Sequence, residues 1–307
     1  MIAETPGQSS PLYDPELDPG FEVIEPDALS CPLVFSSPHS GAIYPRRFLE
    51  RTRLGELQLR RSEDAFVDAL FGGCRGLGAP MIRALFPRTY LDLNREPYEL
   101  DPRMFDGRLP GFANTRSIRV AGGLGTIPRV VGQAQEIYAA RLPLDEALDR
   151  IERHYKPYHA RLRGLVDRAQ QHFGLAVLVD CHSMPSGAPA AGETRARADF
   201  VLGDRHGASC ASVLIEAAEA ELRALGFKVA RNKPYAGGFI TEHHGNPAIN
   251  RHAIQIEVSR SLYMDEPTVE RSERFPEVRA ALTRVAMALA ATAATIARLS
   301  PHRDAAE

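Results

Sequence analysis

Two patterns of apolar and polar positions alternate along the chain: short continuous apolar runs, and longer stretches with helical periodicity. The runs predict strands at 32–36, 81–85, 89–93, 175–179, 199–203 and 253–258, with a short extended piece at 227–230. The periodic stretches predict helices at 53–71, 133–173, 208–225 and 267–299. Strands that alternate with helices indicate an α/β fold, whose mixed or mostly parallel sheet is covered on both faces.

Two of the predicted helices carry further local signals. The apolar residues of 53–71 are spaced so that they share one helical face, namely Leu59, Phe66, Val67 and Leu70. Pro143 and Pro157 predict a break or a kink within 133–173, because proline removes a backbone donor and clashes with the preceding turn.

The remaining segments define the organisation of the chain. Residues 1–20 are predicted to be an N-terminal arm, either held by contacts or loose. Residues 101–132 are rich in glycine and proline and are predicted to be irregular, with a loop that could lie over a site. Because there is no internal repeat and no long linker, we expect one α/β domain over residues 1–307.

Composition excludes several classes of protein. The chain has 307 residues, with 37 Lys+Arg against 39 Asp+Glu and a formal net charge of −2. A dedicated nucleic-acid binder would need a basic surplus, so no nucleic-acid partner is expected. Arginine outnumbers lysine by 34 to 3, and genomic codon bias explains most of that excess.

Cysteines and apolar runs bear on the cellular compartment. The four cysteines form no C-x-x-C pair, which favours a reducing compartment over a disulfide or zinc-knuckle scaffold. The N-terminus lacks the charged and apolar regions of a signal peptide. The apolar stretch 285–297 is too short to span a bilayer and is predicted to lie in a buried or amphipathic helix. We therefore expect a cytoplasmic protein without a membrane partner.

Polar clusters follow or end four of the predicted strands. They are His39, Asn94 with Arg95, the segment 180–183, and Glu257. Ligand sites of open α/β sheets lie beyond the carboxyl ends of the strands, so these clusters are expected to converge on one site. A single histidine at a strand end is more often structural, and it is the convergence that indicates function.

The cluster residues include candidate metal ligands. His39 and His182 carry the imidazole nitrogens that Zn²⁺ prefers, and a catalytic zinc site commonly adds one carboxylate. Three carboxylates are candidates: Glu63, Asp64 and Asp180. Asp180 shares a strand face with His182 and could instead orient its imidazole ring.

Glu257 is the candidate catalytic base. In the strand 253–258, alternation places Ile254, Ile256 and Val258 on one face and Gln255 with Glu257 on the other. A carboxylate in a covered central strand is costly unless it is paired or catalytic, and beside a metal it could accept a proton from water. The alternatives are an exposed edge strand or a salt bridge to Arg260.

Arginines near the same strand ends are candidates for substrate binding. Arg95 suits a substrate carboxylate through its planar fork of donors, or it forms an internal ion pair with Asp92 or Glu96. Arg119 and Arg129 flank the glycine-rich segment, where either could neutralise a second carboxylate or an oxyanion.

Taken together, these motifs resemble the N-formylglutamate amidohydrolase family over residues 30–265. The resemblance rests on the segments 37–41 (SPHSG), 90–95 (YLDLNR), 180–185 (DCHSMP) and 255–265 (QIEVSRSLYMD), with 125–129 (GTIPR) and 155–159 (YKPYH) between them. It implies kinship with zinc carboxypeptidases and a three-layer α/β/α architecture around a mixed, mostly parallel sheet.

The resemblance also implies an activity. This is the metal-dependent hydrolysis of N-formyl-L-glutamate to formate and L-glutamate, the last step of one histidine-degradation route. The alternative is a related zinc carboxypeptidase, or an amidase for another N-acyl amino acid. A cysteine nucleophile at Cys181 is not expected, because adjacent strand residues such as Cys181 and His182 point to opposite faces.

Roles follow residue by residue from the resemblance. His39 and His182 resemble two ligands of Zn²⁺ or another divalent ion, Asn94 and Arg95 resemble the pair that grips the α-carboxylate, and Glu257 resembles the catalytic glutamate. Carboxypeptidases place their carboxylate ligand three residues after the first histidine, but that position is Ala42 here, so Asp64 is our choice. Arg129, His243 and His244 are candidates to hold the oxyanion or the substrate.

Overall fold

A mixed seven-stranded sheet forms the centre of the computed structural model, which describes residues 14–186 and 198–299. The strand order is β1-β3-β2-β8-β11-β9-β10. Four of the six pairings are parallel, while β1 with β3 and β11 with β9 are antiparallel. The strands are β1 (Phe21–Ile24), β2 (Leu33–Ser37), β3 (Met81–Ala84), β8 (Ala176–Met184), β9 (Phe200–Gly203), β10 (Val229–Arg231) and β11 (Arg251–Ser259).

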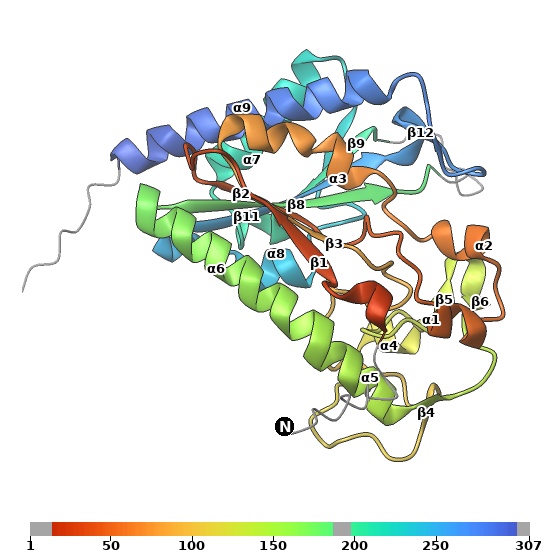
Figure 1. Ribbon diagram of the computed structural model, residues 1–307. Helices are drawn as coiled ribbons and strands as arrows, with labels where there is room; N and C mark the ends of the chain where they lie inside the picture. Colours follow the sequence, from red (N-terminus) through yellow and green to blue (C-terminus); the bar gives the residue numbers. More distant parts are fainter. Residues whose placement is uncertain (1–13, 187–197, 300–307) are drawn as a thin grey trace, which may run out of the picture.

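Helices cover both faces of this sheet, which confirms the predicted three-layer α/β fold (Figure 1). The helices α3, α7 and α9 lie on one face, and α6 lies along the other with α8 and α5. Their bounds are α1 (Arg46–Arg51), α2 (Glu56–Arg60), α3 (Val67–Leu70), α4 (Ile118–Ala121), α5 (Leu144–Arg150), α6 (Lys156–Phe173), α7 (Ser212–Ala224), α8 (Phe239–His244) and α9 (Phe275–Leu299).

Short two-stranded ribbons and 3-10 turns complete the described chain. The ribbons pair β4 (Phe105–Asp106) with β7 (Leu142–Pro143), β5 (Val130–Val131) with β6 (Gln135–Glu136), and β12 (Met264–Asp265) with β13 (Glu270–Arg271). The 3-10 turns are η1 (Pro15–Leu17), η2 (Gly72–Leu77), η3 (Gly132–Ala134), η5 (Arg205–Gly207), η6 (Pro247–Ile249) and η7 (Arg260–Leu262). A π-helical segment, η4 (Ile151–Tyr155), joins α5 to α6.

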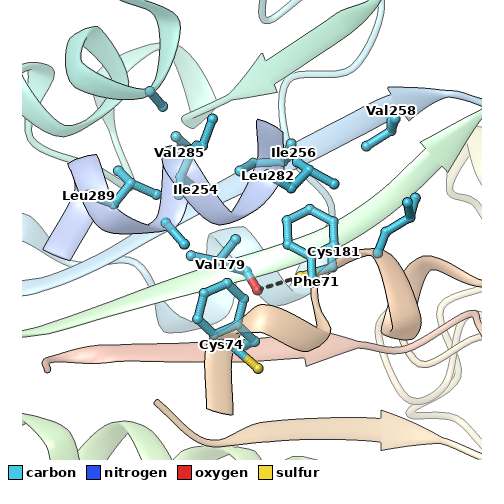
Figure 2. Close-up of a cluster of buried hydrophobic side chains, with 14 of the residues drawn as sticks. Phe71, Cys74, Val179, Cys181, Ile254, Ile256, Val258, Leu282, Val285 and Leu289 are labelled. Carbon is cyan, nitrogen blue, oxygen red and sulfur yellow. Dashed lines mark hydrogen bonds between the residues drawn. The ribbon is translucent and has the colours of Figure 1, made fainter. Parts of the chain in front are cut away.

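Alternation along β8 and β11 places the apolar side chains that pack in the core on one face and the polar side chains of the site on the other, as predicted. Figure 2 shows Ile254, Ile256 and Val258 of β11 beside Val179 and Cys181 of β8, in the core cluster that α9 covers. The intervening residues of the same strands face the α6 side, where polar groups gather at the carboxyl ends. Cys181 therefore lies on the apolar face, opposite His182.

The prediction of one helix over 53–71 is wrong. The segment contains α2 and α3, separated by a turn in which Phe66 adopts a left-handed φ of 64°. A bulky residue there is strained, and it ends any helical continuation. As a result Leu59 packs on one side of the sheet while Val67 and Leu70 pack on the other.

Two further predictions fail where tertiary contacts override the local pattern. The segment 89–93 is not a strand but a buried turn, in which the Tyr90 amide donates to the Pro87 carbonyl and the Asp92 amide donates to that of Thr126. In 133–173, α-helix begins only at Leu144, because the residues before it form η3, β6 and β7, and Pro143 is the N-cap of α5. Pro157 does not break the chain, since it lies in the first turn of α6, directly after the π segment.

One edge of the sheet is formed by β1, a strand that was not predicted, and the predicted N-terminal arm precedes it. β1 pairs antiparallel with β3, which the sequence did not signal. The part of the arm that the structure describes is held by contacts: Leu17 is buried, and Asp14 accepts a hydrogen bond from Tyr90 Oη at 2.7 Å. Residues 1–13 of the arm lie outside the described residues.

Helix α9 has the amphipathic packing that was predicted for the apolar C-terminal stretch. Its buried side chains recur along one face and belong to the core cluster that also contains residues of the sheet and α7. Figure 1 shows α9 lying beside α7 on one side of the sheet. By length and composition alone α9 is a candidate membrane span, a test that core helices of soluble proteins also pass. Its packed face identifies it as the outer layer of this fold.

Candidate active site

A cavity of about 700 Å³ opens at the carboxyl ends of β2, β8 and β11. It brings together most of the residues expected to form the site: His39, Asp64, Asn94, Arg95, Arg119, His182 and Glu257. The irregular segment 101–132 forms part of its wall, through Arg119, Gly122, Leu124, Pro128 and Val130–Gly132. The strand-end clusters therefore converge as the sequence indicated.

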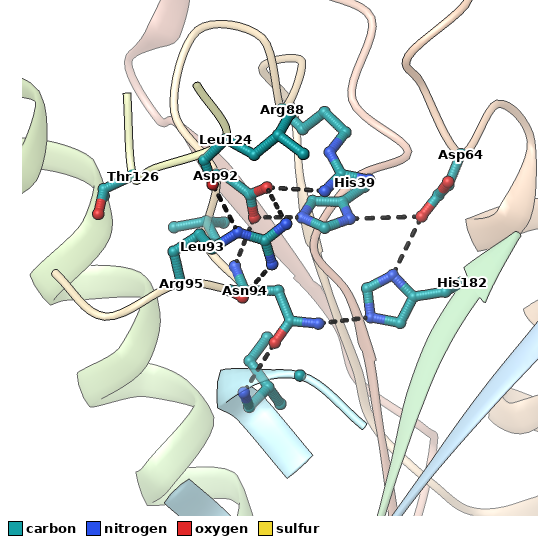
Figure 3. A network of polar contacts seen from close by, with 12 residues as sticks. His39, Asp64, Arg88, Asp92, Leu93, Asn94, Arg95, Leu124, Thr126 and His182 are labelled. Atoms are coloured by element: carbon teal, nitrogen blue, oxygen red, sulfur yellow. Dashed lines mark hydrogen bonds and ion pairs between the residues drawn. The ribbon is translucent and has the colours of Figure 1, made fainter. Parts of the chain in front are cut away.

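Two imidazole rings and one carboxylate meet at the centre of this cavity (Figure 3). Asp64 Oδ2 lies 3.3 Å from His39 Nδ1 and 3.0 Å from His182 Nδ1. The three side chains are buried, and their ligand atoms lie within 4.8 Å of one another. They come from three segments, since His39 follows β2, Asp64 lies between α2 and α3, and His182 lies in β8.

The Asp64 carboxylate is oriented by its other oxygen. Oδ1 accepts hydrogen bonds from Arg260 and from Ser183 Oγ, each at 3.1 Å, which leaves Oδ2 directed at the two rings. The Asp64 amide also donates to the His39 carbonyl at 3.0 Å, which ties the two segments together. Although burial opposes ionisation, the adjacent His182 and His39 rings hold the pKa of Asp64 well below its usual range.

Each imidazole ring is held through its second nitrogen. His39 Nε2 lies 2.7 Å from Asp92 Oδ1, and His182 Nε2 lies 2.9 Å from Asp180 Oδ1. A proton on His39 Nε2, donated to Asp92, leaves the Nδ1 lone pair of His39 facing Asp64. Outer carboxylates commonly orient the histidines of metal sites in this way. Burial opposes a charge on His182, but Asp180 and Asp64 raise its pKa well above the usual value.

The donor set fits a divalent metal ion. Two imidazole nitrogens and one carboxylate oxygen form a common ligand set of catalytic zinc sites. His39 Nδ1 is buried and has no hydrogen-bond partner among the described residues, although it points toward Asp64. A buried lone pair without a donor is costly, and a cation would satisfy it. His39, Asp64 and His182 could therefore hold a metal ion.

The structure separates the three candidate carboxylates. Glu63 faces away from the two histidines, where it accepts a hydrogen bond from Tyr44 Oη at 2.7 Å and pairs with Arg60 at 3.2 Å. Asp180 contacts the outer nitrogen of His182, which is the orienting role considered from the sequence. Asp64 alone of the three belongs to the His39–Asp64–His182 cluster.

Glu257 lines the same cavity from the central strand β11. Gln255 Nε2 donates to Glu257 Oε1 at 2.8 Å, while Gln255 Oε1 accepts from the Gly238 amide at 2.8 Å. β11 lies between β8 and β9, so the edge-strand alternative is wrong, and Arg260 pairs with Asp64 rather than with Glu257. Burial raises the pKa of Glu257 to about 7, a value suited to exchanging protons near neutral pH.

Asn94 and Arg95 lie in the turn after 89–93. Asn94 Nδ2 is 3.0 Å from His182 Nε2, and its Oδ1 accepts from the Ile240 amide at 2.8 Å. Arg95 Nε donates to the Leu124 carbonyl at 2.9 Å, and its guanidinium lies 3.7 Å from Asp92 (Figure 3). The expected internal ion pair therefore coexists with a place in the cavity wall.

Three expected residues lie elsewhere. Arg129 is not among the residues that line the cavity, because its guanidinium turns to Asp101 at 2.9 Å and Glu136 at 3.3 Å. His243 and His244 lie on α8, where His243 is 3.2 Å from Arg163 and His244 stacks on His159. The described cavity wall includes neither histidine. In this structure the three side chains therefore do not line the cavity.

Several residues of the cavity wall were not predicted from the sequence as residues of the site. Arg88 and Asp92 form a 2.7 Å ion pair at the cavity wall, and Arg61 and Tyr235 also line it. Asp92 lies within the alternating motif 90–95, two residues before Asn94, and this shared spacing could have identified it as a site residue. Arg61 and Tyr235 lie in irregular segments, whose position only the tertiary structure sets.

The outer carboxylate Asp180 offers a first test of this geometry. Asp180→Asn removes the negative charge that lies 2.9 Å from His182 Nε2, and we expect metal affinity to fall by about 10–100-fold. Competition with a chelator of known affinity measures this change. Asp204→Asn is the matched control, because Asp204 is also a buried carboxylate but bonds Asn232 at 2.7 Å outside the cavity wall. Equal affinities in both variants would contradict an orienting role for Asp180.

Comparisons with known proteins identify the family. The family model described as N-formylglutamate amidohydrolase matches residues 31–264. N-formylglutamate deformylases of Pseudomonas putida and Pseudomonas aeruginosa are 32% and 29% identical, over 85% of this chain and 92% and 93% of theirs.

Solved structures agree with this result. The N-formylglutamate amidohydrolase of Ralstonia eutropha JMP134 has a TM-score of 0.82 and 38% identity, over 91% of this chain and 98% of that one. A gene product of Agrobacterium tumefaciens shares the fold with a TM-score of 0.63 at 17% identity, over 89% of this chain and 96% of that one. The predicted family is confirmed: this chain belongs to the N-formylglutamate amidohydrolase family.

Proposed function

We propose that this protein hydrolyses N-formyl-L-glutamate to formate and L-glutamate, with Zn²⁺ or another divalent ion held by His39, Asp64 and His182. The observation that carries the proposal is the meeting, in one cavity, of this cluster with Glu257 and a set of arginines. The names of the relatives support the substrate. We further propose that the reaction is the last step of one histidine-degradation route and takes place in the cytoplasm.

The chain's own groups supply the proton chemistry. When bound, a divalent ion supplies Lewis acidity to the formyl oxygen and lowers the pKa of water. Glu257 accepts the proton of the attacking water and later returns it to the leaving amine of glutamate. Gln255 fixes one oxygen of the Glu257 carboxylate and leaves the group in the cavity wall.

The charge of the cavity suits a dianion. Among the described residues that line it, arginine contributes Arg61, Arg88, Arg95, Arg119 and Arg260, and the carboxylates are Asp64, Asp92 and Glu257. The arginine excess would complement the two carboxylates of N-formylglutamate. We assign the α-carboxylate to Arg95 with Asn94, and the γ-carboxylate to Arg119, which is 37% exposed and lies 3.8 Å from Glu99.

Turnover assays test the proposal directly. We expect the purified protein to release formate from N-formyl-L-glutamate, to lose this activity with a chelator, and to regain it with Zn²⁺. The matched substrates N-acetyl- and N-succinyl-L-glutamate should react more slowly, because the acyl group is larger. Faster turnover of either would favour the alternative, an amidase for another N-acyl amino acid. Formate release that persists without a divalent ion would overturn the metal mechanism.

A further inference from the structure

Two buried residues, one at the end of η4 and one in the first turns of α6, have no part in the chemistry above, yet they contact the site's backbone. Tyr155 ends the π segment η4, and His159 follows one turn later on the same face of α6. Both side chains are buried, and both belong to the 155–159 motif that the sequence singled out without a role. Single π turns inside helices occur frequently at functional sites.

Their polar atoms reach the carbonyls on either side of Asn94. His159 Nε2 lies 2.9 Å from the Leu93 carbonyl oxygen, and Tyr155 Oη donates to the Arg95 carbonyl at 2.6 Å. Between them, the Asn94 carbonyl accepts from Arg95 Nη1 at 2.8 Å. Three successive carbonyls of the turn therefore each have a side-chain donor (Figure 3 shows Leu93, Asn94 and Arg95).

This turn aims two side chains at different parts of the site. Asn94 extends to His182 and to the amide of Ile240, while Arg95 extends to Leu124 and Asp92. A small shift of the 93–95 backbone would move both side chains at once. Displacements of about 1 Å in positioning groups can cost on the order of 10²-fold in rate.

His159 and Tyr155 both keep the proton that they donate to the 93–95 carbonyls near neutral pH. Burial lowers the pKa of His159 to about 4, so the ring is neutral near pH 7, and its Nε2 proton faces the Leu93 carbonyl. Burial raises the pKa of Tyr155 above its usual value, so the phenol stays protonated. Both groups thus remain hydrogen-bond donors throughout the neutral range.

We propose that Tyr155 and His159 are positioning residues, which hold the 93–95 backbone so that Asn94 and Arg95 are correctly placed in the cavity. The effect on catalysis rests on the proposed function, whereas the backbone clamp itself does not. Tyr155 acts mainly through Arg95 and therefore on substrate binding. His159 acts mainly through Asn94 and therefore on the orientation of the His182 ring, which Asn94 contacts.

Tyr158 provides a matched control on the same helix. It lies between Tyr155 and His159 in the sequence and is fully buried. Its hydroxyl lies 2.9 Å from Oγ of Ser36 in β2, so it does not contact the 93–95 turn. Tyr155→Phe and Tyr158→Phe each remove one buried hydroxyl. A merely structural role predicts the same result for both variants, namely a lower Tm without a change in KM.

The experiment combines hydrogen exchange with kinetics. In Tyr155→Phe we expect faster amide exchange in a peptide covering 91–96 and a KM for N-formyl-L-glutamate raised about 3- to 10-fold, the loss typical of one hydrogen bond, with kcat nearly unchanged. In His159→Phe we expect the same faster exchange and a lower kcat. His159→Gln, whose amide can donate to the Leu93 carbonyl, should recover part of that kcat.

Two results would overturn the proposal. One is unchanged exchange of 91–96 in both Tyr155→Phe and His159→Phe. The other is a pattern in which Tyr158→Phe changes exchange and KM as much as Tyr155→Phe does. If the wild-type protein does not turn over N-formyl-L-glutamate, the proposed function fails, and the exchange comparison still decides whether the clamp exists.

Discussion

Replacement of Glu257 by glutamine is expected to lower kcat by about 10³-fold, within the range typical for loss of a general acid–base group. The change removes the proton acceptor but keeps the size of the side chain. The amide oxygen of the new side chain can still accept the 2.8 Å hydrogen bond that Gln255 Nε2 donates to Oε1 of Glu257. Binding should persist because the arginines and the metal-ligand cluster are untouched. Steady-state kinetics gives the fall in kcat, and calorimetry with L-glutamate gives the affinity.

Two controls make this result specific to proton transfer. Glu257→Asp keeps a carboxylate but withdraws it by one methylene, so its kcat should fall between that of the wild type and that of Glu257→Gln. Metal content and Tm should be close to those of the wild type in both variants. Turnover by Glu257→Gln at the wild-type rate would exclude Glu257 as the base.

The predictable part of the site is the part that strand alternation controls. In β8 and β11 the side-chain period of two fixes which residues enter the apolar core and which face the cavity. Asp180 with His182, and Gln255 with Glu257, could therefore be assigned to one face from the sequence. Ile254 and Cys181 could be assigned to the other face by the same argument.

The unpredicted part depends on turns whose shape is set by distant contacts. The segment 89–93 has the apolar pattern of a strand, but its amides pair with Pro87 and Thr126. The left-handed Phe66 ends the helical periodicity that begins near Leu59. Periodicity records which residues are buried; it does not record where the backbone hydrogen bonds go.

The second large expected effect is the loss of bound metal when Asp64, rather than its neighbour Glu63, is replaced. Adjacent carboxylates in a turn point in different directions, which the sequence could not resolve. In Asp64→Asn we expect a loss of metal affinity greater than the about 10–100-fold typical of an outer partner, with loss of activity. Dialysis against Zn²⁺ followed by measurement of bound metal checks this. The amide still accepts from Arg260, so a folded variant is expected at a lower Tm.

Glu63→Gln is the matched control, because it also removes one buried negative charge and leaves an amide of the same shape. Its partners are Tyr44 and Arg60, so we expect a lower Tm with wild-type metal content and nearly unchanged kcat. A fall in Tm common to both variants thus reports the loss of buried ion pairs. A fall in bound metal in Asp64→Asn alone reports the ligand. The reverse result, with metal lost from Glu63→Gln and kept by Asp64→Asn, would show that the turn rearranges when a metal ion binds and that Glu63 supplies the ligand.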